Sequence, residues 1–189
     1  MSSPYIDIVQ LQKNIAVSRD VKAYEILFRH FYTPLIRFSA SIIRSREGAE
    51  EVYCDVMLKV WDLGTALNNI DNLKVYLFIS VKNASLNYLA KYYKVQTVDI
   101  DSIAMELHYD TTVEDDLVYT EFRRNLALAI KSLPAKAQLV FKLIKEDGFS
   151  YKHVAEILGI SVNTVEGHMT TALKKINTSL RMYLRPNSN

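Results

Sequence analysis

The sequence predicts an all-α protein of two small helical domains joined by an acidic linker. Apolar residues recur at helical spacing through residues 20–94 and again through residues 118–185. Only 5 glycines and 4 prolines occur in 189 residues, so few positions favour turns. Between the helical parts, residues 95–116 carry seven acidic side chains and no lysine or arginine. We therefore expect domains at residues 5–94 and 118–185, with a linker at residues 95–117.

The composition argues against several classes of protein. The single cysteine, Cys54, excludes an internal disulfide and a cysteine-rich metal site. The 4 histidines are scattered, and neither a nucleophile–base pair nor a phosphate-binding glycine loop is visible. We expect no enzyme, no cofactor, no metal and no small-molecule substrate. The N-terminus lacks a signal peptide pattern, and no apolar run reaches membrane-spanning length. A cytoplasmic protein without direct membrane insertion is the expectation.

Three helices are predicted in the first domain. Residues 20–44 form an amphipathic helix, kinked at Pro34, with a stripe of Tyr24, Leu27, Phe28, Phe31, Leu35, Phe38 and Ile42. Ser45 is a suitable N-cap for a second helix over residues 47–63, whose opposite faces are apolar and acidic. Residues 73–94 form the third helix, and lysines are its only charged residues.

Four helices are predicted in the second domain. A helix over residues 118–133 precedes Pro134, which suits the first turn of the next helix. The stretch "SYKHVAEILGISVNTVEGHMTTALKKI" then predicts two helices joined at a corner. Gly159 permits the left-handed conformation that this corner requires, and Ser161 is a good N-cap for the last helix. This pattern indicates a helix–turn–helix.

The last helix has two different faces. Its predicted apolar stripe is Val165, Met169, Ala172, Leu173, Ile176 and Leu180. Its outer face is polar and free of bulk, which suits a major groove, and consists of Asn163, Thr164, Glu166, Gly167, Thr170, Thr171 and Lys174. Gly167 lowers helix stability, and close approach to another surface is one reason for a glycine there. The alternative is a plain helical hairpin with a solvated face.

Basic residues near this stretch suit contacts to phosphates. They are Lys142, Lys145, Lys152, Lys174, Lys175, Arg181 and Arg185. Ordinary surface lysine is an equally good explanation for any one of them.

The order of motifs along the chain resembles one family. "AEEVYCDVMLKVWD", "YLFISVKNASLNYLAKYYK", the acidic linker and "LPAKAQLVFKLIKEDGFSYKHVAEILGISVNTVEGHMTTALKKI" together resemble bacterial sigma factors of the extracytoplasmic-function (ECF) group, over about residues 20–180. The stretch "YLFISVKNASLNYL" resembles the corresponding stretch of sigma factors common in the Bacteroidetes. The resemblance implies that the first domain is sigma region 2, which binds core RNA polymerase and opens the minus-ten element. It implies that the second domain is region 4, which reads the minus-thirty-five element of promoter DNA.

The resemblance also implies two sets of site residues in the first domain. Helix 47–63 corresponds to the polymerase-binding segment, with candidates Glu51, Asp55, Leu58, Lys59, Trp61 and Asp62. Core packing is the equal alternative for Trp61, and the family usually has glutamine where Cys54 stands. The stretch "LNNIDN" corresponds to the loop that captures a flipped base. The minus-ten candidates are Asn69, Asp71, Asn72, Lys82, Asn83, Asn87 and Lys91.

Some alternatives stay open. Capping explains Asn72 at least as well as base recognition, and Tyr92 or Tyr93 either stacks on a base or caps the core. A LuxR-like helix-turn-helix transcriptional regulator is the alternative for the whole chain, but it needs a receiver or ligand-binding domain that residues 1–94 do not suggest. A sigma-like protein that binds polymerase without opening DNA is the third. The family also implies a membrane-bound anti-sigma factor as a partner.

Overall fold

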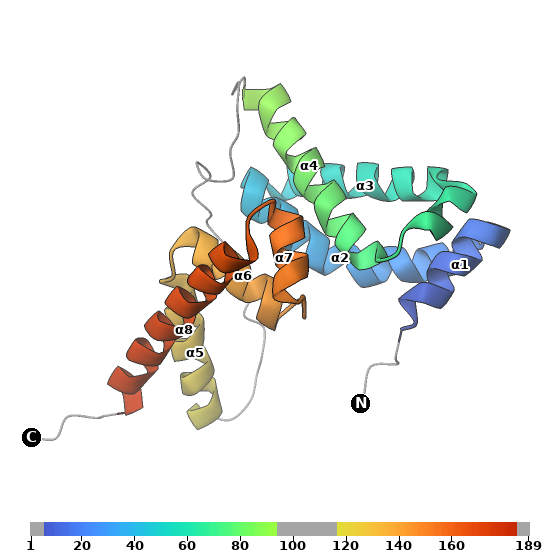
Figure 1. The fold of residues 1–189 in the computed structure, drawn as a ribbon. Coiled ribbons are helices and arrows are strands. Elements are labelled where there is room, and N and C mark those ends of the chain that lie inside the picture. The colour runs from blue at the N-terminus through green and yellow to red at the C-terminus, as the bar shows by residue number, and fades with distance from the viewer. Residues whose placement is uncertain (1–5, 94–116, 185–189) are drawn as a thin grey trace, which may run out of the picture. The chain divides into compact units, whose positions relative to one another are not determined.

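The computed structural model describes residues 6–93 and 117–184. The chain divides into two compact units, Met1–Ile103 and Ala104–Asn189, and every regular element in the described residues is a helix (Figure 1). Unit 1 contains α1 (Ile8–Ser18), α2 (Val21–Ile43), α3 (Arg46–Asp62), the 3-10 helix η1 (Gly64–Asn69) and α4 (Leu73–Tyr93). Unit 2 contains α5 (Leu117–Lys131), α6 (Ala135–Lys145), α7 (Tyr151–Leu158) and α8 (Val162–Leu184). The predicted all-α class is confirmed.

Side-chain caps begin the helices of unit 1. Asp20 caps α2 by accepting hydrogen bonds from the backbone N–H groups of Lys22 and Ala23, at 2.9 and 3.1 Å. These bonds satisfy donors that have no partner within the first helical turn. The helix α2 continues through Pro34 and ends at Arg44, whose left-handed backbone (φ 61°) turns the chain into α3.

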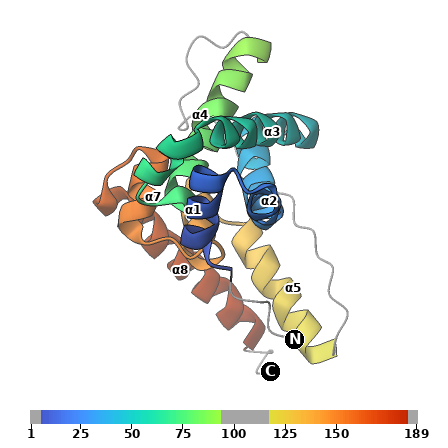
Figure 2. The ribbon, with the colours of Figure 1, turned by 90° about the vertical axis from the view of Figure 1, so that its right-hand side faces the viewer.

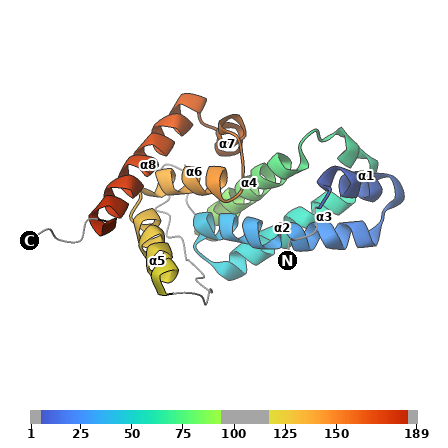
Figure 3. The same cartoon turned by 90° about the horizontal axis from the view of Figure 1, so that it is seen from below.

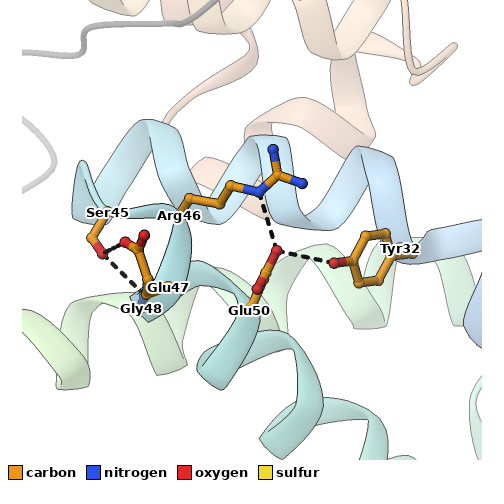
Figure 4. A network of polar contacts seen from close by, with 6 residues as sticks. All are labelled: Tyr32, Ser45, Arg46, Glu47, Gly48 and Glu50. Carbon is orange, nitrogen blue, oxygen red and sulfur yellow. Dashed lines mark hydrogen bonds and ion pairs between the residues drawn. The ribbon is translucent and has the colours of Figure 1, made fainter.

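The start of α3 is tied to α2 by a polar network (Figure 4). Ser45 is the N-cap, as predicted, and its Oγ accepts from the N–H of Gly48 at 3.1 Å. One carboxylate oxygen of Glu50 accepts both from Tyr32 on α2, at 3.0 Å, and from Arg46, at 3.1 Å. The bond from Tyr32 joins α2 to α3, whereas the Arg46–Glu50 pair lies within α3, one helical turn apart, and orients the carboxylate.

The core of unit 1 lies where α2, α3 and α4 pack together. Figure 1 shows α4 crossing the adjacent pair formed by α2 and α3. Five members of the predicted stripe on α2 are buried, namely Leu27, Phe31, Leu35, Phe38 and Ile42, whereas Tyr24 and Phe28 are half-buried. At the crossing of α3 and α4, a Cβ atom added to Gly48 would lie 2.8 Å from the ring of Tyr88. The glycine thus leaves room for the end of the Tyr88 side chain between these helices.

The helix α1 was not predicted from the sequence. Asp7 caps this helix by accepting from the N–H of Gln10 at 3.0 Å, and Gln12, Ile15 and Ala16 form its buried face. It packs against η1 and α2 at one end of unit 1, which faces the viewer in Figure 2.

In unit 2, α8 packs against α5, α6 and α7, which Figure 3 shows from below. One cluster of its core joins Ala129, Ile130 and Leu133 to Ala137 of α6 and to Ala172 and Ile176 of α8. The buried amide of Gln138 donates to the carbonyl of Ile130 at 2.8 Å and ties α6 to the end of α5.

Three expectations for unit 2 were wrong. Leu173 is 47% exposed, because it lies at the edge of the buried face of α8, about 100° around the helix from the buried Ala172. Lys142 is only 4% exposed and lies on the inner side of α6, so it does not belong among the surface phosphate contacts. Pro134 occupies the capping position before α6 and not its first turn.

Candidate nucleic-acid interface

The helix–turn–helix of unit 2 is built as the sequence predicts. α7 ends at Gly159, whose φ of 72° lies in the left-handed region that a side chain disfavours. The N–H groups of Gly159 and Ile160 donate to the carbonyl of Ala155 at 2.9 and 3.0 Å and close the end of the helix. Ser161 then caps α8 by accepting from the N–H of Thr164 at 3.0 Å. The turn between the helices is therefore fixed by backbone and capping hydrogen bonds.

The predicted outer face of α8 is solvent-exposed over its whole length. This holds for Asn163, Thr164, Glu166, Gly167, Thr170, Thr171 and Lys174. A Cβ atom added to Gly167 would meet nothing within 4 Å, so packing inside unit 2 does not require a glycine there. The hydroxyl of Thr171 donates to the carbonyl of Gly167 at 2.9 Å, which leaves its oxygen free to accept from a base amino group.

Four of the basic residues predicted to contact phosphates are on the surface of unit 2. Lys145, Lys152, Lys175 and Arg181 are exposed, and they are available for phosphate contacts. Arg185 lies outside the described residues. His168 on α8 is half-buried, and burial lowers its pKa, with a smaller effect from Lys136. Both effects favour the neutral form of this histidine over the charged form.

The exposed face of α3 carries the candidates for polymerase binding. Val52, Val56 and Val60 face the core, whereas Glu51, Asp55, Leu58, Lys59 and Asp62 are exposed. Leu58 is 59% exposed, so its apolar side chain is accessible among these charged neighbours. Single exposed apolar side chains are common on protein surfaces, so the set of residues on this face is what makes it a candidate for protein binding. Cys54 is also exposed on this helix.

Trp61 is half-buried at the end of α3 and contacts side chains of its own unit. The guanidinium carbon of Arg19 lies 4.2 Å from the centroid of its ring, and Arg19 also donates to the Trp61 carbonyl. The ring of Tyr24 packs edge-on against it, with the centroids 5.0 Å apart. The side chain thus has an ordered orientation and keeps part of its surface accessible.

The minus-ten candidates lie on the connection between η1 and α4 and along α4. Asn69 and Asp71 are exposed, and so is Asn72, whose side-chain oxygen accepts from the N–H of Val75 at 3.1 Å. Asn72 therefore caps α4, the alternative that the sequence left open. On α4, Asn83, Asn87 and Lys91 recur every four residues and are exposed, whereas burial lowers the pKa of the half-buried Lys82.

An aromatic pair ends the described part of α4. The rings of Tyr88 and Tyr92 lie 4.4 Å apart between centroids, and the Nζ of Lys91 lies 5.0 Å from the ring of Tyr92. Tyr92 is 52% exposed, so one of the two tyrosines named as possible base-stacking groups is accessible. The side chain of Tyr93 is outside the described set.

Within residues 6–93 and 117–184 there is no group of three histidine, cysteine or carboxylate side chains arranged to hold a metal ion. In the same part of the chain, none of the helices has both the length and the apolar character needed to span a bilayer.

Two residues that were not predicted as site residues hold parts of unit 1 in place. Gln12 on α1 donates to carbonyls at the end of η1, and Arg19 holds Trp61. The available signal for Gln12 was a polar residue among apolar residues of helical spacing after a capping aspartate, in "DIVQLQKNIAVS". No sequence signal predicts that Arg19 contacts a residue 42 positions away.

One protein family and several known proteins are similar in sequence to this chain. Residues 123–176 match the family described as "Sigma-70, region 4", and they include the helix–turn–helix. Over 188 residues the chain is 22% identical to the ECF RNA polymerase sigma-E factor of Escherichia coli (strain K12), covering 93% of this chain and 98% of that protein. The sigma-E factor of Shigella flexneri matches to the same extent.

Solved structures share the fold. One contains the sigma factor RpoE with the anti-sigma factor NepR from Bartonella quintana (TM-score 0.57, 23% identity, covering 85% of this chain and 98% of that chain). Another contains CnrH with the cytosolic domain of CnrY (TM-score 0.55, 20% identity, covering 93% and 99%). Unit 1 has no strand in its described residues, so the βαβ receiver of a LuxR-like regulator is not favoured. Residues 123–176 thus resemble sigma-70 region 4, and along nearly its whole length the chain is similar to the ECF RNA polymerase sigma-E factor.

Proposed function

We propose that this protein is an ECF-type sigma factor that binds core RNA polymerase and directs transcription initiation at specific promoters. The observation that carries the proposal is the extent of the similarity, which spans both units and 98% of the Escherichia coli sigma-E factor. The protein acts in the cytoplasm and performs no covalent chemistry. Its binding energy positions the polymerase and stabilises the opened strand.

We assign polymerase binding to the exposed face of α3. Leu58 and the accessible part of Trp61 provide apolar contact area, and Glu51, Asp55, Lys59 and Asp62 surround them with charge. An apolar centre with a charged rim combines affinity with an orientation-dependent electrostatic fit. The contact between Arg19 and Trp61 reduces the entropy that the indole would lose on binding.

We assign minus-ten recognition to the loop before α4 and to the exposed stripe of α4. Asn69 and Asp71 present amide and carboxylate groups that suit the edge of an extruded base. Asn72 contributes mainly by capping α4. Lys82 and Lys91 contact phosphates, and Asn83 and Asn87 contact bases or the single strand. A phosphate near Lys82 would offset the burial that lowers its pKa.

We assign minus-thirty-five recognition to the outer face of α8. Asn163, Thr164, Thr170 and Thr171 supply short polar groups for base edges, Lys174 contacts a phosphate, and Gly167 allows the helix backbone to approach the groove. Glu166 suits acceptance from a cytosine amino group. Because this face has little positive charge, its own affinity is modest, and promoter choice depends on both DNA contacts at the correct spacing.

The domain boundaries at residues 5–94, 95–117 and 118–185 belong to the same proposal. The acidic linker lies outside the described residues, except that α5 begins at Leu117, the last residue assigned to it. Its seven carboxylates suit the positive channel that carries RNA out of the polymerase.

An anti-sigma factor is the proposed regulatory partner. Support comes from the two solved relatives, of which one is in complex with an anti-sigma factor and the other with the cytosolic domain of CnrY. The stretch "YLFISVKNASLNYL" supports a Bacteroidetes-type member of the group.

Transcription in vitro tests the proposal. Core polymerase is supplied with this protein and with a promoter that is either fully duplex or already melted at the minus-ten element. A sigma factor gives specific transcripts from both templates without any other initiation factor. A LuxR-like regulator gives transcripts only after a housekeeping sigma factor is added, and a sigma-like binding protein gives them only from the melted template.

A further inference from the structure

The helix α1 holds the loop that precedes α4. Gln12 lies on the inner face of α1 and is only 7% exposed, so its amide is shielded from water. Its Nε2 atom donates two hydrogen bonds, one to the carbonyl of Leu67 and one to the carbonyl of Ile70, each 2.8 Å long. A glutamine amide has two N–H donors, so both are used by this loop. The two bonds bridge 55 and 58 residues of sequence.

These bonds fix both ends of the segment that carries Asn68 and Asn69. The N–H of Ile70 donates to the carbonyl of Leu67 at 3.3 Å and closes the final turn of η1. Leu67 is fully buried, whereas Asn68, Asn69 and Asp71 are exposed. Because the loop backbone is anchored on its inner side, these polar groups are directed outward before any DNA arrives.

We infer that Gln12 is the positioning residue of the base-capture loop: its two hydrogen bonds preorganise Asn69 and Asp71 to read the extruded base of the minus-ten strand. The inference rests on the proposed function of this loop. Preorganised groups lose less entropy when they bind. They also discriminate better between bases, because the loop cannot rearrange to form hydrogen bonds with the edge of a wrong base. Gln12 itself does not touch DNA.

The competing explanation is that Gln12 only stabilises unit 1. A buried amide that donates to two carbonyls stabilises a fold whatever the protein does, and its loss leaves those carbonyls without that donor. The two explanations differ in what they predict for base selectivity. Loss of stability alone lowers the fraction of folded protein equally for every DNA, so the ratio of affinities for two sequences stays constant.

The test uses full-length protein assembled with core polymerase. Selection from random short single-stranded DNA by the wild-type holoenzyme first defines a preferred strand. Affinities for that strand and for its single-base substitutions are then measured by fluorescence anisotropy, and their ratio gives the selectivity. Gln12→Leu removes both donors at similar volume. We expect it to lower selectivity about three- to tenfold, in keeping with one to two lost hydrogen bonds, and to leave minus-thirty-five duplex binding unchanged.

Two controls accompany Gln12→Leu. Ser39→Ala removes the buried hydrogen bond to Ser85, 2.8 Å long, between α2 and α4. Ser85 lies about 18 Å along α4 from the loop, so this variant matches the lost bond without touching the loop. The double variant Asn69→Ala with Asp71→Ala removes the proposed base-reading groups directly. Hydrogen exchange of the loop amides should quicken in Gln12→Leu alone.

The outcomes separate failure of the inference from failure of the proposed function. If the double variant loses selectivity and Gln12→Leu keeps it, the role of Gln12 is refuted and the loop assignment stands. If Ser39→Ala loses as much selectivity as Gln12→Leu, Gln12 acts only through stability and the inference is again refuted. If the double variant keeps full selectivity, the loop does not read the base, and both the assignment and the inference built on it fail.

Discussion

Replacing Gly167 by alanine should make unit 2 more stable and its DNA binding weaker. Gly167 lies inside α8, is exposed, and has no atom within 4 Å of the position that a Cβ would occupy. The methyl group therefore meets no obstacle in the free protein. Alanine is more favourable than glycine by about 0.8–1 kcal/mol in a helix interior. For a domain of this size, that gain raises the midpoint of thermal unfolding by roughly 4–8 °C.

The same methyl group should interfere with DNA. If the backbone of α8 approaches the floor of the major groove at Gly167, a Cβ there either separates the surfaces or shifts the helix. Overpacking of a close contact costs about 1–3 kcal/mol, which is roughly a five- to 150-fold loss of affinity. Calorimetry measures the stability of the variant, and fluorescence anisotropy with minus-thirty-five duplex measures its affinity for DNA.

Asn177→Ala is the matched control, because Asn177 is exposed on α8 but lies ten residues beyond Gly167, about 15 Å along the axis. It should raise stability by a smaller amount and leave DNA affinity unchanged. A Gly167→Ala variant with increased stability and wild-type affinity would refute the close-approach argument. A variant with lowered stability would refute the description of the site as open.

Three further predictions concern other parts of the molecule. Replacing Lys82 and Asn83 by alanine should impair promoter opening, measured by permanganate reactivity of unpaired thymines, more than it impairs polymerase binding; normal opening would refute the minus-ten assignment. Arg19→Ala should remove the cation–π contact that holds the ring of Trp61, a contact that contributes about 0.5–1 kcal/mol at an exposed site. The fluorescence of this single tryptophan should then shift to longer wavelength, because the ring becomes more exposed to water. Arg19→Lys should keep part of the cation–π contact and show a smaller shift. An unchanged spectrum in Arg19→Ala would contradict the contact. His168→Gln should reduce the loss of stability of unit 2 in acid. The pKa of His168 is lower in the folded state than in the unfolded chain, so the unfolded state binds the proton first as the pH falls. The free energy of unfolding of the wild type is therefore full above about pH 6.5 and declines as the pH falls through the pKa of the folded state. Equal loss of stability in the variant and the wild type between about pH 7 and pH 5 would exclude this histidine as the cause.

Local sequence signals predicted most helices correctly. Ser45 and Ser161 were identified as caps, and both accept the backbone hydrogen bond that a cap requires. Gly159 was identified as the corner of the helix–turn–helix, and its backbone is left-handed. These signals are reliable because a cap or a left-handed glycine is decided within a few residues, without help from the rest of the chain. The start of α1 also has a local signal, the N-cap Asp7, although α1 was not predicted.

Periodicity was less reliable at the edges of helical faces. Leu173 and Lys142 were misplaced because a spacing of three or four residues fits two neighbouring faces, and only the packing partners decide between them. Trp61 was left open between core packing and polymerase binding; it is half-buried, with its ring against Arg19 and Tyr24, and its part in polymerase binding stays a prediction.

By itself, the sequence determined the helical class, the caps, the position of the helix–turn–helix and the polar face of its last helix, because these depend on residues close together in the chain. Tertiary structure alone decided that Gln12 meets the carbonyls of Leu67 and Ile70 and that Arg19 meets Trp61. Contacts of this kind join residues more than 40 positions apart, and no local pattern records them. They arise only when α1 packs against the rest of unit 1, and those of Gln12 anchor the backbone beside the loop residues that the sequence had already named.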